Sequence, residues 1–331
     1  MTHKSAAIIA DKLTKLYGDL LAVDGISFQV DEGEIFGFLG PNGSGKTSTI
    51  RMLVGLSRPS GGRASVLGYD LPGESSQAKR YVGVVPDSSN LYDELSAREN
   101  LLFMARLYGV PRKEQNSRVD RLLQDFGLYE RRDDLFGTFS RGMKRALTIA
   151  AALVHEPRLL FLDEPTAGLD AAAARSLRRL ISGLREKGMT VFLTTHYLTE
   201  ADMLCDRIAI LVQGRIVRID TPDGLKHLIQ DQSLIEFSFR GDVSALLADL
   251  QSRLEGGQAA LLDSSHIRVY GGDPPRIFDA VFQSSRESGI GLESASTIRP
   301  SLEDAFLQIT GLSPQVMAAD KGSGKGSGVG R

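Results

Sequence analysis

The stretch Gly40-Pro41-Asn42-Gly43-Ser44-Gly45-Lys46-Thr47 decides the fold of this chain. It has the spacing G-x-x-x-x-G-K-[ST] of a P-loop, whose backbone N–H groups surround phosphate oxygens. Before it, Glu34 to Leu39 is an apolar run typical of a buried strand, and after it Lys46 to Leu56 carries apolar residues at helical spacing. Strand, glycine-rich turn and helix are the context that this motif requires, so the sequence predicts a nucleotide-phosphate site.

The residue types in the loop match the chemistry of a nucleotide. Lys46 can reach the β- and γ-phosphates as a positive charge, and we count it among the catalytic residues. The hydroxyl of Thr47 suits Mg²⁺, which prefers oxygen ligands. The ATP-binding set comprises Gly40, Asn42, Gly43, Ser44, Gly45, Lys46, Thr47 and, directly after the motif, Ser48.

A second apolar run, Leu159 to Leu162, ends in the pair Asp163-Glu164. Ligands of parallel α/β sheets lie at the carboxyl ends of the strands, so we expect Asp163 to hold the magnesium shell. Side chains alternate along a strand, and on that basis Glu164 points elsewhere and polarises a water that attacks the γ-phosphate. Helix capping is the commoner role of such a pair; the nearby P-loop favours catalysis.

The remaining pattern predicts an α/β P-loop NTPase with additions. Short strands at Ala6 to Ile9 and Ile26 to Val30 suggest an N-terminal antiparallel β-layer. Residues from about 96 to 155 have helical periodicity and predict a helical subdomain. Apolar runs at Leu159 to Leu162 and Thr190 to Thr194, separated by a helix, indicate a parallel sheet.

A different pattern begins near residue 233. Strands are predicted at Leu234 to Phe239, His266 to Tyr270 and Leu292 to Ile298, each followed by a helix-like segment, and Ser301 with Asp304 nearly matches a capping box. We therefore divide the chain into an ATPase domain (1–232), a small α+β domain (233–312) and a tail (313–331) too poor in apolar residues to be ordered.

Composition limits the partners. A net charge of -2 over 331 residues removes the electrostatic reason to expect nucleic acid. The single cysteine, Cys205, cannot form an internal disulfide. No run approaches the about 18 apolar residues of a membrane span, and Met1 to Ala10 lacks the pattern of a secretion signal, so we expect a soluble chain.

Four further segments, in the order found here, make the chain resemble the nucleotide-binding subunit of ABC transporters over most of residues 6 to 220. Phe139-Ser140-Arg141-Gly142-Met143 is similar to the signature loop LSGGQ, and Pro165 to Asp170 (PTAGLD) is similar to the D-loop. His196 occupies the position of the switch histidine. Tyr17 occupies the position of the aromatic residue that stacks on adenine.

The resemblance implies a head-to-tail dimer, with a second copy or a paired subunit, that buries two ATP molecules. Ser140 and the N–H of Gly142 would bind the γ-phosphate held by the partner's Lys46, and Asp170 would also act across the interface. His196 would bind the γ-phosphate and hold the attacking water with Glu164. ATP would then join the two chains, and hydrolysis would release them.

Two positions depart from the family pattern. Arg141 replaces a glycine, and it either adds a charge near the partner's phosphates or faces solvent, the reading that we favour. Asp87 stands where a magnesium-contacting glutamine is usual, and we retain it as a further metal ligand. These variants, with Ser301 to Phe306 (SLEDAF) before Gly311, are similar to the exporter branch known as ABC-2, which includes drug-resistance ATPases of the daunorubicin type.

The resemblance implies separate transmembrane ABC-2 permease subunits, contacted near Asp87 to Glu99, and a location at the cytoplasmic face of the cell membrane. The rival is a soluble ABC ATPase acting on ribosomes or nucleic acid, which usually fuses two cassettes or inserts a coiled coil; neither is seen here. A P-loop GTPase lacks support because no NKxD motif is present. The cargo depends on the membrane partner, and transport direction rests on resemblance.

Overall fold

A computed structural model describes residues 5–229 and 234–312 of the chain. These residues form two compact units, one ending at Pro222 and one spanning Asp223–Gly311. The domain boundary expected at residue 232 and the tail expected at residues 313–331 lie outside the described residues.

A six-stranded sheet forms the centre of the first unit, in the order β10-β9-β3-β8-β7-β6. Its strands are parallel except β10, which pairs antiparallel with β9. The bounds are β3 Ile35–Leu39, β6 Val82–Val85, β7 Leu159–Asp163, β8 Thr190–Thr195, β9 Arg207–Val212 and β10 Arg215–Asp220. This confirms the predicted parallel α/β sheet, to which the structure adds β6, β9 and β10.

An antiparallel sheet, in the order β2-β1-β4-β5, forms the predicted N-terminal layer. Its strands are β1 Ala6–Tyr17, β2 Leu20–Asp31, β4 Gly61–Val66 and β5 Tyr69–Leu71. The first two strands are longer than predicted, because register shifts between Ala10 and Lys15 interrupt the alternation that sequence reading depends on. Phe28 of β2 packs against Phe38 of β3, with ring centroids 4.9 Å apart, so aromatic packing joins this layer to the central sheet.

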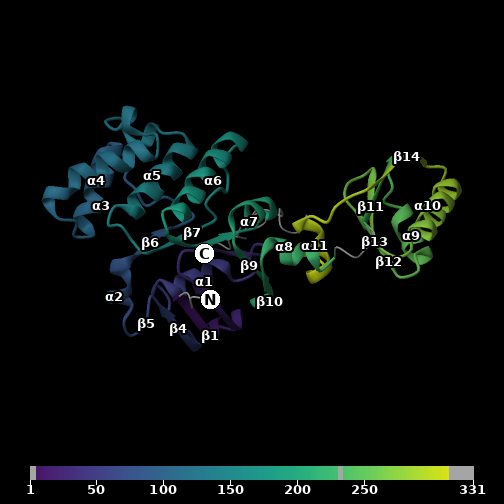
Figure 1. Cartoon of the computed structure of the whole chain (residues 1–331), viewed down its shortest axis with the longest axis horizontal. Helices are drawn as coiled ribbons and strands as arrows, with labels where there is room; N and C mark the ends of the chain where they lie inside the picture. The colour runs from purple at the N-terminus through teal and green to yellow at the C-terminus, as the bar shows by residue number, and fades with distance from the viewer. Residues whose placement is uncertain (1–4, 230–233, 313–331) are drawn as a thin grey trace, which may run out of the picture. The chain divides into compact units, whose positions relative to one another are not determined.

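The helices of the first unit include a group, α3, α4 and α5, that Figure 1 shows together and away from β1 and β4. The bounds are α1 Lys46–Leu53, α2 Ser75–Ala78, α3 Ala97–Leu107, α4 Arg112–Asp125, α5 Arg141–Leu153, α6 Ala171–Glu186 and α7 Leu198–Leu204. Helix α1 ends before the predicted Leu56. Gly55 adopts φ 67° there, and the N–H of Leu56 returns to the carbonyl of Arg51.

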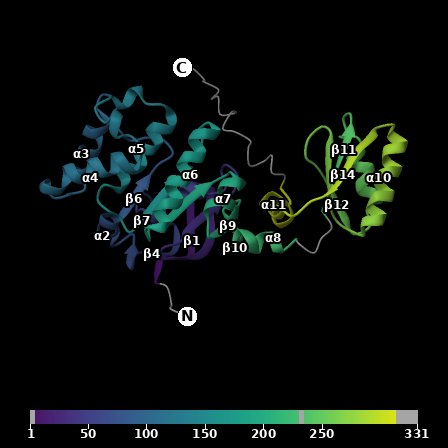
Figure 2. The ribbon, with the colours of Figure 1, turned by 45° about the horizontal axis from the view of Figure 1, so that its top comes forward.

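The second unit follows the order β-α-β-β-α-β of a ferredoxin-like fold. Its elements are α8 Pro222–His227, β11 Leu234–Arg240, α9 Leu246–Arg253, β12 Gly257–Leu261, β13 His266–Gly271, α10 Pro274–Ser288, β14 Gly291–Thr297 and α11 Leu302–Thr310. The strands are antiparallel in the order β12-β13-β11-β14. This is the small α+β fold that the sequence predicts, with β12 as an unpredicted strand; Figure 2 gives a second view.

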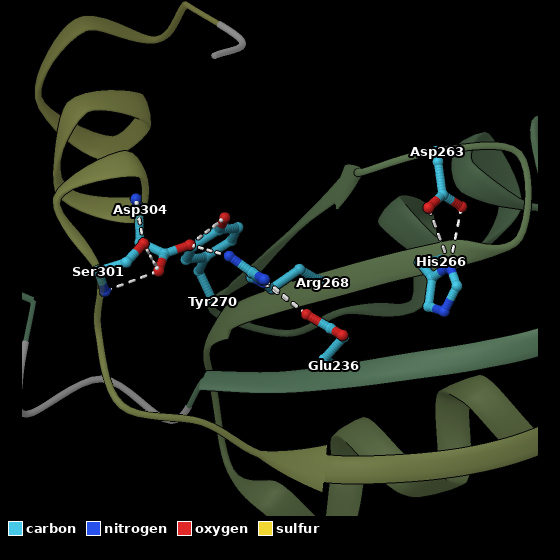
Figure 3. A network of polar contacts seen from close by, with 7 residues as sticks. All are labelled: Glu236, Asp263, His266, Arg268, Tyr270, Ser301 and Asp304. Carbon is cyan, nitrogen blue, oxygen red and sulfur yellow. Dashed lines mark hydrogen bonds and ion pairs between the residues drawn. The ribbon is translucent and has the colours of Figure 1, made fainter. Parts of the chain in front are cut away.

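A polar network ties α11 to the sheet of this unit (Figure 3). Asp304 is 1% exposed, and its Oδ1 accepts hydrogen bonds from Arg268 at 2.6 Å and from Tyr270 at 2.9 Å. Its Oδ2 accepts from the N–H of Ser301, which completes the predicted capping box. Glu236 accepts from the other end of the Arg268 guanidinium at 2.5 Å. Each charge in this buried network therefore has an opposite partner.

No helix among residues 5–229 and 234–312 is both long and apolar enough to cross a bilayer. The thiol of Cys205 is buried and free, and burial raises its pKa well above the usual value. It therefore carries no reactive thiolate.

Candidate functional site

The P-loop lies between β3 and α1 and is shaped for an anion. Gly45 precedes the helix with φ 105°, a conformation that favours glycine, and a Cβ there would lie 2.5 Å from the carbonyl oxygen of Ala22. The hydroxyl of Ser44 is buried and has no hydrogen-bond partner among the described residues. A phosphate oxygen would satisfy that hydroxyl, so the loop fits the predicted ligand.

Lys46 is 5% exposed and folds back over the loop. Its Nζ donates to the carbonyl oxygens of Gly40 at 2.6 Å and Pro41 at 3.1 Å, and it lies 3.2 Å from Oε1 of Glu164. The ammonium group is therefore held by oxygens at the centre of the loop, where phosphate oxygens can replace them.

Thr47 and Asp163 meet on the same side of the loop. The hydroxyl of Thr47 donates to Oδ1 of Asp163 at 3.3 Å, and the hydroxyl of Thr194 donates to the same oxygen at 2.6 Å. This hydroxyl and carboxylate form an oxygen-rich pair that suits Mg²⁺. In the described part of the chain, no three His, Cys, Asp or Glu side chains are grouped to hold a metal, so Asp87 completes no such cluster.

Glu164 has different partners from Asp163, as expected, but strand alternation, the reason expected for this, was wrong. The strand ends at Asp163, and Glu164 adopts φ 50°, so strand alternation does not apply to it. Its N–H donates to the carbonyl oxygen of Thr194 at 3.1 Å. A turn into a sparsely populated backbone region thus aims the carboxylate, and such outliers cluster at functional sites.

His196 follows β8 and meets Glu164 directly. Its Nδ1 lies 2.7 Å from Oε2 of Glu164. Burial alone would raise the pKa of Glu164, but the contacts with His196 and Lys46 outweigh it and lower that pKa. Glu164 is therefore ionised at neutral pH, and the structure brings Lys46, Glu164 and His196 together as predicted neighbours.

Arg145 is a residue of this site that sequence reasoning missed. It lies in α5 and is buried. Its guanidinium donates to the carbonyl oxygens of Asp163 at 2.5 Å, Pro165 at 3.0 Å and Asp87 at 3.2 Å. Burial lowers the pKa of Arg145. One side chain thus holds the segment that follows β6 and the segment that follows β7 around the carboxylates, a role that no local pattern signals.

Ser140 and Asp170 begin two neighbouring helices. The hydroxyl of Ser140 accepts from the N–H of Met143 at 3.3 Å at the start of α5, and Asp170 accepts from the N–H of Ala173 at 2.9 Å at the start of α6. A Cβ on Gly142 would lie 2.8 Å from that of Ala173, so glycine lets the two helices approach. The three predicted trans residues therefore lie on adjoining helix starts.

Tyr17 is the last residue of β1 and is 42% exposed, with the Nζ of Lys15 over its ring at 4.9 Å from the centroid. Burial raises the pKa of its hydroxyl, but hydrogen bonds with Ser48 and Ser57 outweigh burial and lower it. Ser48 thus contacts Tyr17, which links the P-loop helix to the predicted adenine-stacking residue.

Together, the loop, the Asp163-Glu164 strand end and His196 define a P-loop nucleotide hydrolase. A family model described as ABC transporter matches residues 23–167. The chain is 37% identical over 303 residues to the linearmycin resistance ATP-binding protein LnrL of Bacillus subtilis (strain 168), covering 91% of this chain and 97% of that protein. It is 36% identical over 320 residues to the daunorubicin/doxorubicin resistance ATP-binding protein DrrA of Streptomyces peucetius, covering 94% of each.

A solved structure titled as the ATP binding subunit of an ABC transporter matches with a TM-score of 0.61 and 33% identity, over 67% of this chain and 92% of that one. The chain belongs to the ABC transporter family, as an ATP-binding and ATP-hydrolysing subunit. The predicted likeness to drug-resistance ATPases of the ABC-2 branch is confirmed. These relatives give no support to the alternative of an ATPase acting on ribosomes or nucleic acid.

Proposed function

We propose that this chain energises an ABC-2 exporter by closing two copies over ATP and opening them after hydrolysis. The observation that carries the proposal is the contact of one carboxylate, Glu164, with both Lys46 and His196. The Glu164 carboxylate as base, the Lys46 ammonium group and the His196 imidazole thus lie together beside the phosphate-binding loop.

In this mechanism the loop N–H groups and Lys46 hold the phosphates. Because Lys46 contacts Glu164, a bound γ-phosphate would take over the ammonium group and release Oε1 of Glu164 toward water. His196 would keep the other carboxylate oxygen oriented at 2.7 Å and contact the γ-phosphate. The ionised state of Glu164 suits it to accept a proton from that water.

Thr47 and Asp163 would hold Mg²⁺ in this site, and Asp87 is a further proposed ligand. When bound, the ion would neutralise charge on the phosphate oxygens. The chain's own part is to orient the oxygens, which Thr194 and Arg145 do through contacts with the side chain and the carbonyl of Asp163.

The second copy would complete each site. Tyr17 would stack on adenine, while Ser140, the N–H of Gly142 and Asp170 would reach the nucleotide held by the other chain. The hydroxyl of Ser140 can donate to a phosphate oxygen while its lone pair accepts from Met143. Nucleotide would thus be shared between two copies, or between this chain and a paired subunit.

We place the complex at the cytoplasmic face of the membrane, joined to separate ABC-2 permease subunits near Asp87 to Glu99. The linearmycin and daunorubicin resistance names of the relatives favour a drug-like cargo and export as the direction. Identification of the membrane protein that co-purifies with the full chain tests this part.

Glu164→Gln tests the mechanism. The substitution keeps the shape of the side chain and removes the base, so ATP hydrolysis should fall by about 10²-fold or more while ATP still binds. Gel filtration with ATP and Mg²⁺ should then show a dimer. Glu186→Gln, the same change on an exposed residue at the end of α6, is the matched control and should hydrolyse ATP as the unchanged chain does. Normal turnover, or a persistent monomer, would contradict the proposal.

A further inference from the structure

The first turn of α5 carries more positive charge than its partners neutralise. Arg141 is the first residue of the helix, Lys144 the fourth and Arg145 the fifth, and the turn contains no acidic residue. A helix N-terminus already bears a partial positive charge, so basic residues are disfavoured there unless an anion is near.

Two of the three basic side chains are occupied within the chain. Lys144 pairs with Asp93 at 2.9 Å. Arg145 is buried and holds the loop carbonyls around Asp163. Arg141 differs: it is exposed, and no carboxylate among the described residues pairs with it. Its Nη1 donates a long hydrogen bond, 3.4 Å, to the carbonyl oxygen of Gly168.

The neighbours of Arg141 indicate which ligand its side chain can contact. It stands between Ser140 and Gly142, the two residues that the proposed function assigns to the partner's γ-phosphate. The contact with Gly168 also places the guanidinium beside the loop that leads to Asp170, the third proposed trans residue. Arg141 therefore lies on the surface that would face the nucleotide of a second copy.

In place of the solvent-facing role favoured from the sequence, we infer that Arg141 is a catalytic residue that acts in trans, its guanidinium binding the γ-phosphate held by Lys46 of a second copy of this chain. This inference rests on the proposed function. A planar guanidinium matches phosphate oxygens with two parallel N–H groups and adds charge where the transferred phosphoryl group carries it. The same anion relieves the excess positive charge of the first turn of α5.

Arg141→Ala is the first test, measured as ATP hydrolysis by the purified full chain. Loss of one hydrogen bond to a charged group should lower kcat by roughly ten- to a hundredfold. Arg112→Ala is the matched control, because Arg112 is likewise an exposed arginine at the first position of a helix, α4. It should keep normal kcat. Equal activity of Arg141→Ala and the unchanged chain would overturn the inference.

Mixing separates action on a second copy from action on Gly168 of the same chain. In a mixed dimer of Arg141→Ala and Lys46→Ala chains, one site combines an intact Lys46 with an intact Arg141. Hydrolysis should therefore exceed the sum of the two variants alone. No gain would mean that Arg141 acts within its own chain, which would overturn the inference.

A parallel mixture of Ser140→Arg and Lys46→Ala chains tests the shared site itself. If ATP hydrolysis rises in this mixture but not in the mixture with Arg141→Ala, then Arg141 has no role in trans and the proposed function still holds. If ATP hydrolysis rises in neither mixture, both the inference about Arg141 and the proposed shared site are wrong.

Discussion

Two buried charge clusters among the described residues, one around Lys46 and Glu164 and one around Asp304, use similar residue types for opposite purposes. Around Lys46 and Glu164, the backbone is held at φ 50° and the nearby hydroxyl of Ser44 lacks a partner among the described residues. Around Asp304, the arginine, the tyrosine and the helix cap all meet the same carboxylate (Figure 3). The first cluster thus contains an unsatisfied hydroxyl and a strained turn where a ligand is expected, whereas every charge of the second cluster already has a partner.

The largest expected effect comes from a substitution in the first cluster, at Lys46. Lys46→Ala should abolish ATP turnover, because no other cation lies within the loop to hold the phosphates. Stability should change little by comparison, since the ammonium contacts serve the ligand. Steady-state ATPase assays and thermal unfolding of the same preparation measure both quantities. Normal turnover in this variant would remove Lys46 from the site.

Asp304→Ala should have the opposite result. It leaves the Arg268 guanidinium without its buried partner and removes the cap of α11, so the second unit should lose about 3–5 kcal/mol of stability. Native-state hydrogen exchange in residues 234–311 measures the loss. Glu293→Gln is the control, because its pair with Arg240 is exposed and contributes less than about 1 kcal/mol. Equal losses in the two variants would show that the Asp304 network is not structural.

The smallest expected effect is a dependence on acid pH. Burial alone would raise the pKa of Asp304, but its hydrogen bonds with Ser301 and its ion pair with Arg268 outweigh burial, so the net pKa is lowered. Because the pKa of Asp304 is lower in the folded chain than in the unfolded chain, where it is about 3.9, ionisation of Asp304 stabilises the fold at pH values above about 3.9. This stabilisation is lost as the pH falls through the pKa of the folded state. The protection factors of amides in the second unit, which compare each exchange rate with that of an unfolded chain at the same pH, should therefore fall in acid. Asp304→Asn should remove part of that dependence; an unchanged acid profile would contradict the assignment.

Much of the site could be predicted from sequence, because its motifs are local. The P-loop, the Asp163-Glu164 pair and the Ser301 capping box each depend on neighbours a few residues away, and each appears where expected. The central strands β3, β7 and β8 are recognisable as short apolar runs. The full length of β1 and β2 is not, since the register shifts between Ala10 and Lys15 break the expected alternation.

Other features depend on distant residues and carry no local signal. Arg145 reads as an ordinary helical arginine, yet its hydrogen bonds reach carbonyls from two other segments of the chain. The contact of Arg141 with Gly168 likewise joins segments separated in sequence. Neither could be inferred from spacing, because each needs the folded arrangement of α5 beside the loops.

The sequence alone determined which chemical groups this protein brings to a nucleotide, and in which order along the chain. Only the tertiary structure decided how they are aimed: the left-handed turn at Glu164, the burial of Arg145 and the exposure of Arg141. The physical reason is that a motif is set by short-range backbone geometry, whereas direction, burial and charge pairing depend on packing between segments far apart in sequence.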